Sequence, residues 1–153
     1  MSTPSERLAA LGLTLPPVAP PQAAYVPAVR TGNHVYVSGQ LPIVEGKLQA
    51  TGKVGEAVSA EEAAVLARLC ALNGLAAAAS VAGGLDAIRR IVKVTGFVAS
   101  VPSFTGQPVV INGASEFLIE VFGEAGRHAR SAVGLAVLPL DTPVEVELIV
   151  EVA

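Results

Sequence analysis

The 153-residue sequence contains no tryptophan, a single cysteine and few charged side chains. Because Cys70 has no partner in the chain, a disulfide-stabilised scaffold is excluded, and a reducing compartment is favoured. No run approaches the roughly 20 consecutive apolar residues of a membrane-spanning helix. Ser5, Glu6 and Arg7 interrupt the pattern of a secretory signal. We therefore expect a cytoplasmic protein with no membrane partner.

Positive charge is also scarce, with 10 Lys and Arg against 13 Asp and Glu, and aromatic residues make up 4% of the chain. The basic residues are scattered, so the sequence lacks both the electrostatic footprint and the stacking platform of a nucleic-acid-binding protein. Hydrophobic residues nevertheless reach 52%, with only 15% charged. A monomer would leave much apolar surface uncovered, so we expect a homo-oligomer.

The first 22 residues form an N-terminal lead-in to a single domain that covers residues 23–153. Thr3-Pro4-Ser5-Glu6 has the pattern of a helix start, with a capping Thr, an early Pro and a Glu at the third position. We expect this short helix to end near Gly12. An extended segment follows, because prolines recur at four positions: Pro16, Pro17, Pro20 and Pro21.

Turn residues and β-branched or aromatic side chains predict a hairpin at the start of the domain. Its strands are expected at Tyr25–Val29 and His34–Ser38, joined by Thr31-Gly32-Asn33. The glycine-rich stretch Glu45–Gly55 is interpreted as a loop or an edge strand.

Two helices are predicted from capping signals and from apolar spacing. Ser59-Ala60-Glu61-Glu62 resembles a capping box and begins an alanine-rich helix that should run to Gly83-Gly84. Its core-facing positions are expected to be Leu66, Leu69, Cys70 and Ala77. The second helix should span about residues 108–122, with one apolar face made by Val110, Ala114, Phe117, Leu118 and Val121.

Three further strands are expected at residues 88–98, 131–138 and 143–152. In the last strand Val144, Val146, Leu148, Val150 and Val152 alternate with Glu145, Glu147, Ile149 and Glu151. This period of two predicts one apolar face and one largely acidic face. The element order predicts an α+β fold, in which two main helices cover one face of a mostly antiparallel sheet.

Several candidate sites fail on spacing. Gly46–Val54 lacks the spacing and the Ser or Thr of a phosphate-binding loop. His34 and His128 are the only histidines, and neither has a Cys or carboxylate at metal-ligand spacing, so no metal site is expected. Ser38 lacks the preceding glycine of a nucleophile elbow, and Cys70 is interpreted as a small core residue.

Arg130 stands out because it directly precedes the apolar run Ala132–Val137. A guanidinium in such surroundings needs an anionic or carbonyl partner, since burying it unpaired is costly. Arginine also has the geometry to bind a carboxylate through two parallel hydrogen bonds. Composition leaves two interpretations open: an internal salt bridge with a C-terminal glutamate, or an anchor for an anionic ligand.

Four blocks of sequence resemble the RidA (YjgF-type, "endoribonuclease L-PSP") family. They occur in the family's order across about residues 23–153, nearly the whole domain: Val37–Pro42, Ile91–Val98, Ala129–Val133, and Leu138-Pro139 followed by Val144–Glu147. The resemblance implies a chorismate-mutase-like fold, assembled as a homotrimer with ligand clefts between subunits. It also implies hydrolysis of reactive 2-enamino and 2-imino acids, such as 2-aminoacrylate, to 2-keto acids and ammonia without a cofactor.

The resemblance also implies roles for individual residues. Arg130 matches the arginine that binds the substrate carboxylate, and Glu145 matches the acid that positions or activates the attacking water. Tyr25 matches the tyrosine of the cleft. Ser38 and Gly39 match residues that line the pocket, and the family's pocket asparagine matches Asn112.

With two departures from the typical pattern, the chain resembles an extended branch of the family. Ala132 stands where a typical member has cysteine, and the segments 4–21 and 102–109 lengthen the compact archetype. The sequence therefore predicts an imine deaminase that uses Arg130 and Glu145. The alternatives are a non-catalytic protein that binds a small carboxylate in the same cleft, and an endoribonuclease, which the missing basic track disfavours.

Overall fold

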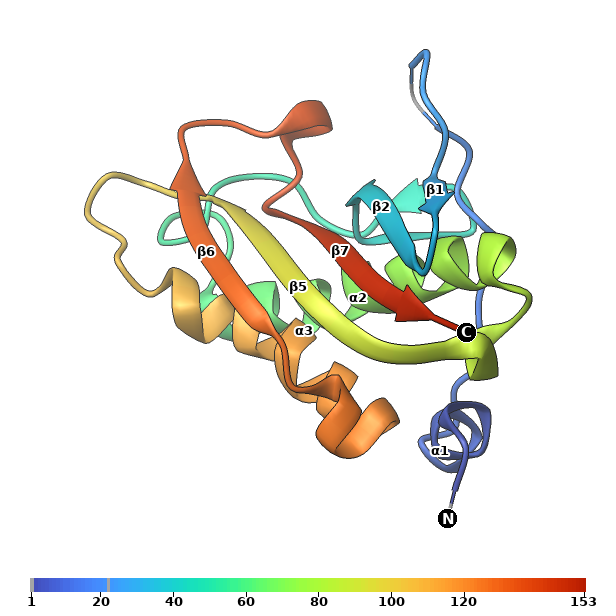
Figure 1. The fold of residues 1–153 in the computed structure, drawn as a ribbon. Helices are drawn as coiled ribbons and strands as arrows, with labels where there is room; N and C mark the ends of the chain where they lie inside the picture. The colour runs from blue at the N-terminus through green and yellow to red at the C-terminus, as the bar shows by residue number, and fades with distance from the viewer. Residues whose placement is uncertain (1, 22) are drawn as a thin grey trace.

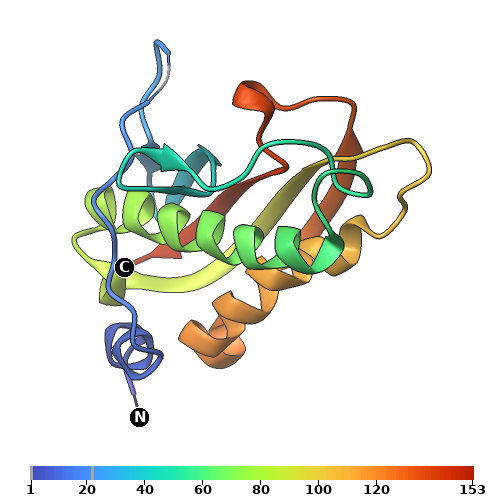
Figure 2. The same ribbon diagram turned by 180° about the vertical axis from the view of Figure 1, so that it is seen from behind.

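The computed structural model describes residues 2–21 and 23–153, and it confirms the α+β fold with two long helices against one face of a sheet (Figures 1 and 2). The sheet order is β1-β2-β7-β5-β6, and only β5 and β6 run parallel. The sheet strands are β1 (Ala28–Thr31), β2 (His34–Gln40), β5 (Ile88–Ala99), β6 (Ala129–Leu135) and β7 (Val144–Val152).

The central strand β7 has the two faces that its alternation predicts. Its five apolar residues from Val144 to Val152 are buried against the helices, whereas Glu145, Glu147, Ile149 and Glu151 are half-buried on the opposite face. We call that opposite side the open face of the sheet. No helix covers it, as Figures 1 and 2 show.

The helix α2 (Ala60–Ala82) begins and ends where its caps predict. Ser59 Oγ accepts from the Glu62 amide, and Gly83 ends the helix with a φ of 96°. Cys70 and Ala77 are buried as expected, but Leu66 and Leu69 are only half-buried. The expected face was partly wrong because small residues, rather than leucines, make the closest approach to the sheet. By length and composition alone α2 could cross a membrane, yet 61% of its most apolar window is buried inside the domain.

The helix α3 (Gln107–Phe122) confirms the second helical prediction, and all five residues of its expected apolar face are fully buried. The helices and the sheet approach closely at glycines. A Cβ on Gly96 of β5 would lie 2.4 Å from Ile111 on α3, and one on Gly113 would lie 1.9 Å from the Ala64 carbonyl oxygen. A larger side chain would push α3 away from β5 at Gly96 and away from α2 at Gly113.

The N-terminal helix α1 (Pro4–Ala10) has the complete capping box that its sequence predicts, between Thr3 and Glu6. Its Leu8 is buried in the same core as the helices and the sheet. Ser5 fixes the helix to the short 3₁₀ turn η1 (Leu85–Ala87), because its amide and hydroxyl both donate to the Asp86 carboxylate.

Strand boundaries differ from expectation at both ends of the sheet. The first strand begins at Ala28 instead of Tyr25, because Pro27 has no amide hydrogen to donate to a sheet. The glycine-rich stretch contributes a separate small hairpin, β3 (Ile43–Val44) with β4 (Lys47–Leu48). The 3₁₀ turns η2 (Gly123–Gly126) and η3 (Pro139–Asp141) flank β6.

Candidate functional site

Arg130 is the second residue of β6, because that strand begins at Ala129 instead of at the expected Ser131. Its register partner is the fully buried Val94, so its side chain leaves the sheet on the helix side. There Nη1 donates to Asn112 Oδ1 at 2.8 Å and to Ser115 Oγ at 3.2 Å, and Nη2 donates to the Pro108 carbonyl at 3.3 Å. The three acceptors lie one turn apart along α3, so the helix holds the guanidinium along its length.

All three partners of the Arg130 guanidinium are uncharged. Within residues 2–21 and 23–153 the ion pairs are Arg68–Glu120 and Arg127–Glu124, and neither includes Arg130. The internal salt bridge to a C-terminal glutamate therefore has no partner in the described part of the chain. A guanidinium held by neutral oxygens keeps its full positive charge for an external anion.

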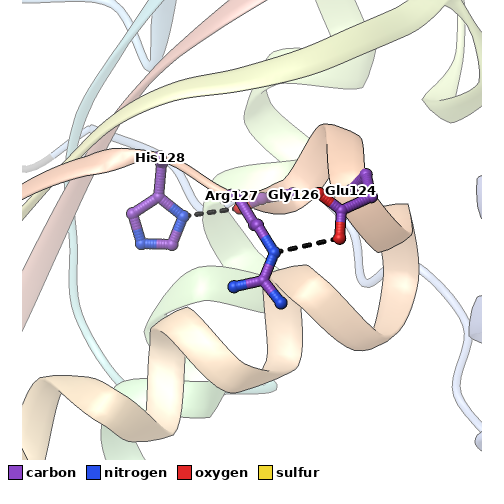
Figure 3. A network of polar contacts seen from close by, with 4 residues as sticks. All are labelled: Glu124, Gly126, Arg127 and His128. Carbon is purple, nitrogen blue, oxygen red and sulfur yellow. Dashed lines mark hydrogen bonds and ion pairs between the residues drawn. The ribbon is translucent and has the colours of Figure 1, made fainter.

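His128 lies two residues before Arg130, and both side chains contact the Ser115 hydroxyl. Its Nδ1 donates to the Gly126 carbonyl at 2.6 Å, a contact drawn in Figure 3, and its Nε2 lies 2.8 Å from Ser115 Oγ. Burial lowers the pKa of His128, and the nearby positive charge of Arg130 lowers it further, although the Gly126 bond acts in the opposite direction. The ring is therefore neutral at neutral pH. A shallow hollow of about 230 Å³ opens beside these groups and is also lined by Ile119 and Arg127.

Glu145 lies on the open face of β7, in a second hollow of about 260 Å³. Tyr25 and Gly39 line the same hollow, and its remaining walls are mostly apolar: Ala19, Pro20, Pro21, Ala23, Gln40, Leu41, Ile43 and Pro139. The structure thus brings three of the expected site residues together. The proline-rich lead-in closes one side of the hollow, a contribution that the sequence did not predict.

The Glu145 carboxyl group lies in surroundings that disfavour its charge. Burial raises its pKa, and the neighbouring Glu147 carboxylate raises it further. In the described part of the chain Glu145 joins no ion pair and accepts no hydrogen bond from another residue. A carboxyl group with a raised pKa can both give and take a proton near neutral pH, as general acid–base chemistry requires.

Gly39 makes room for this carboxyl group. It lies in a bulge of β2, between the positions that pair with Leu148 and Val146. A Cβ at Gly39 would lie 2.7 Å from the Glu145 Cδ atom, closer than real Cβ contacts allow. The glycine is required here for space, and any side chain would push the carboxyl group out of its position.

Ser38 lines neither hollow, and its hydrogen bonds are structural. Its hydroxyl donates to the Val26 carbonyl at 2.7 Å and its amide donates to the Pro27 carbonyl at 2.9 Å. These bonds fasten the segment before β1 to β2, and so help to place Tyr25, which is 46% exposed.

The expected site residues therefore fall into two groups on opposite faces of the sheet. Arg130 and Asn112 lie on the helix side at the β6 edge, and Tyr25, Gly39 and Glu145 lie on the open face. The sequence missed Ser115 and His128, although Ser115 follows Asn112 by three residues and had to share its helical face. His128 could not be found this way, because it lies on a different element.

Comparisons with known proteins agree with the fold. Residues 5–152 match the family described as "YjgF/chorismate mutase-like, putative endoribonuclease". The chain is 45% identical over 142 residues to protein TCP17 of Trypanosoma cruzi, covering 92% of this chain and 89% of the relative.

Solved structures show the same similarity. The protein Atu1372 of Agrobacterium tumefaciens, of unknown function, is 52% identical with a TM-score of 0.89, over 98% of this chain and 92% of that one. TdcF of E. coli with bound serine is 26% identical with a TM-score of 0.64, over 91% of this chain and 94% of that one.

Proposed function

Because the chain belongs to the YjgF/chorismate mutase-like family, we propose that it is an enamine/imine deaminase that hydrolyses 2-imino acids to 2-keto acids and ammonia. The observation that carries this proposal is the bonding of Arg130. Its guanidinium is held by three uncharged oxygens of α3, so it remains available to a carboxylate. A relative, TdcF, binds serine, which is a small molecule with a carboxylate.

The reaction requires that the imine carbon is held in place and that protons are moved between water and the nitrogen. Arg130 binds the substrate carboxylate and thereby orients the adjacent imine carbon. Glu145 takes a proton from water as the water oxygen bonds to that carbon, and then returns a proton to the nitrogen. Glu145 then takes the hydroxyl proton of the resulting carbinolamine and passes a proton to its nitrogen. The C–N bond breaks as the C=O bond forms, which releases ammonia and leaves a 2-keto acid. The raised pKa of Glu145 suits both proton transfers, since both protonation states are accessible.

Because Arg130 and Glu145 lie on opposite faces of the sheet, the proposal requires a second copy of the chain. The open face offers an apolar surface for it: Val29, Tyr36 and Val133 are 51%, 48% and 43% exposed. Pairing of Val29 with Tyr36 and of Phe97 with Val133 places them on the same side as Glu145. We propose a homotrimer in which Arg130 of one subunit meets the Glu145 hollow of the next. A cytoplasmic location remains a prediction.

The test is imine hydrolysis by the purified protein. A serine dehydratase generates 2-aminoacrylate, and the rate of keto-acid release is measured with and without the chain. We expect Arg130→Ala to abolish the acceleration and Arg130→Lys to impair it strongly, because a point charge cannot replace the planar fork. Arg90→Ala is the matched control, since Arg90 is exposed on β5 away from both hollows.

No acceleration by the wild-type chain with several imino acids would contradict the deaminase. If keto acids then raise the melting temperature without turnover, the chain is a carboxylate-binding protein that uses the same cleft. RNA cleavage that survives repurification would instead support the endoribonuclease description.

A further inference from the structure

Ser115 and His128 form an ordered chain of hydrogen bonds that ends on Arg130. The direction of each bond follows from its partners. The Gly126 carbonyl can only accept, so His128 Nδ1 carries the proton. In the neutral ring Nε2 is then an acceptor, and the Ser115 hydroxyl donates to it. Arg130 can only donate, so its Nη1 donates to Ser115 Oγ.

The chain of bonds therefore has a single direction, from Arg130 through Ser115 and His128 to Gly126. The Ser115 hydroxyl proton points at the imidazole, so a lone pair of Oγ is directed to the guanidinium. Gly126 is buried, and η2 fixes its carbonyl at the start of β6. Each element is thus placed by a rigid part of the fold: Ser115 by α3, His128 by its bond to Gly126, and Arg130 by β6.

We propose that Ser115 and His128 are positioning residues that hold the Arg130 guanidinium in its carboxylate-binding orientation, and that they do so only while His128 is neutral. The inference rests on the proposed function for the identity of the anion. It goes beyond it by giving a role to two residues outside the proposed Arg130–Glu145 pair: Ser115, which contacts Arg130, and His128, which contacts Ser115.

Protonation of His128 reverses the direction of its hydrogen bond with Ser115. Nε2 becomes a donor, so Ser115 loses its acceptor and its oxygen must accept from the imidazolium and the guanidinium together. Two positive charges then share one oxygen, and the exposed side of the Arg130 site lets the guanidinium move away. Two further charged groups of the described chain are drawn with the ring in Figure 3, Arg127 and Glu124, which are bound to each other at 3.1 Å. They offset each other, so Arg130 is the charge that opposes protonation.

The kinetic test compares two substitutions of His128 in the imine assay. His128→Phe removes the acceptor, and we expect KM to rise roughly 2- to 10-fold, as for loss of one net hydrogen bond, with kcat changed less. His128→Gln keeps an acceptor oxygen near the Nε2 position, so it should restore KM. Ser115→Ala and Ser115→Thr form the same kind of pair on the other residue.

The pH profile is the readout that a merely structural role would not move. In the wild type KM should rise as the pH falls below the ordinary histidine range, because His128 then becomes charged. In His128→Gln this acidic rise should disappear. An unchanged KM in His128→Phe would overturn the proposal. An equal rise of KM in His128→Phe and His128→Gln would also overturn it.

Nitrogen NMR of the wild-type imidazoles tests the direction of these hydrogen bonds independently of the kinetics. The two histidines are assigned by comparison with His34→Asn. We expect His128 to carry its proton on Nδ1, and Arg130→Ala to raise its pKa. A neutral ring that carries its proton on Nε2 would contradict the proposed hydrogen-bond directions, even if the enzyme is active. If the ring signals are as expected but the protein does not hydrolyse imines, the proposed hydrogen-bond directions hold and the deaminase proposal is wrong.

Discussion

Arg130 and Glu145 lie on strands of one sheet that are separated only by β5, yet their surroundings are opposite in kind. Arg130 has three uncharged hydrogen-bond acceptors. Glu145 has an apolar hollow, a neighbouring carboxylate and no bonding partner among the described residues. Hydrogen bonds orient the Arg130 guanidinium, whereas the Glu145 carboxyl group is made reactive by the lack of them. The comparison predicts that changes at Glu145 affect chemistry most, whereas changes around Arg130 affect binding.

The largest effect is expected for Glu145→Gln. Loss of the titratable group should lower kcat by about 100- to 10,000-fold, the usual contribution of a general acid–base group. KM should change much less, because the carboxylate anchor remains. Steady-state kinetics in the imine assay measure both constants.

Glu151→Gln, at the other end of the same face of β7, is the matched control and should keep full kcat. If Glu145→Gln raised KM and left kcat intact, the comparison between the two hollows would be reversed.

A smaller effect is expected for Asn112→Asp. This change turns a neutral acceptor of Arg130 into a carboxylate, which creates the internal salt bridge that the wild-type chain lacks. We expect the new pair to compete with the substrate and raise KM by about 10- to 100-fold, as for a hydrogen bond to a charged group.

Asn112→Ala provides the comparison, because it removes one acceptor without adding a charge. It should raise KM less than Asn112→Asp does. An alanine that is as harmful as the aspartate would show that Asn112 acts through its own bond and that neutrality of the site is unimportant.

The smallest effect concerns stability, and it has opposite signs at the two hollows. The folded state raises the pKa of Glu145 above 4.5, so the stability that protonation provides is lost as the pH rises through that raised value. The folded state lowers the pKa of His128 below 6.5, so stability is lost as the pH falls from there through the lowered value.

Urea unfolding over a pH series measures both slopes. Glu145→Gln should be more stable than the wild type at neutral pH, because it removes a carboxyl group whose charge the folded state disfavours. His128→Gln should remove the loss on the acidic side. A stability that does not respond to Glu145→Gln at any pH would show that the carboxyl group is solvated.

Much of this architecture was predictable because it depends on neighbours in sequence. The capping box at Thr3 and Glu6, the buried face of α3 and the alternation of β7 each follow from local spacing and were confirmed. The placement of β6 is different. It pairs in parallel with β5 instead of with the next strand in sequence, and the chain reaches β7 through η3.

The site was predictable by residue but less so by arrangement. Period-two spacing puts Arg130 and Ala132 on one face of β6, yet it cannot say which face turns to the helices. That choice depends on where β6 packs, which no local pattern records. The Ser115–His128 contact likewise joins a helix to the residue before a strand, so it depends on the tertiary fold alone.

The position of β7 has a consequence for how the chain is made. It is the last of the five sheet strands in sequence, yet it lies between β2 and β5 and pairs with both. The two halves of the sheet cannot join until residues 144–152 have left the ribosome, and these long-range pairings slow folding. Glu145 arrives within that same segment. An incompletely synthesised chain therefore presents two unjoined strand edges, to which chaperones and proteases have access, and it cannot yet contain either the core or the acid.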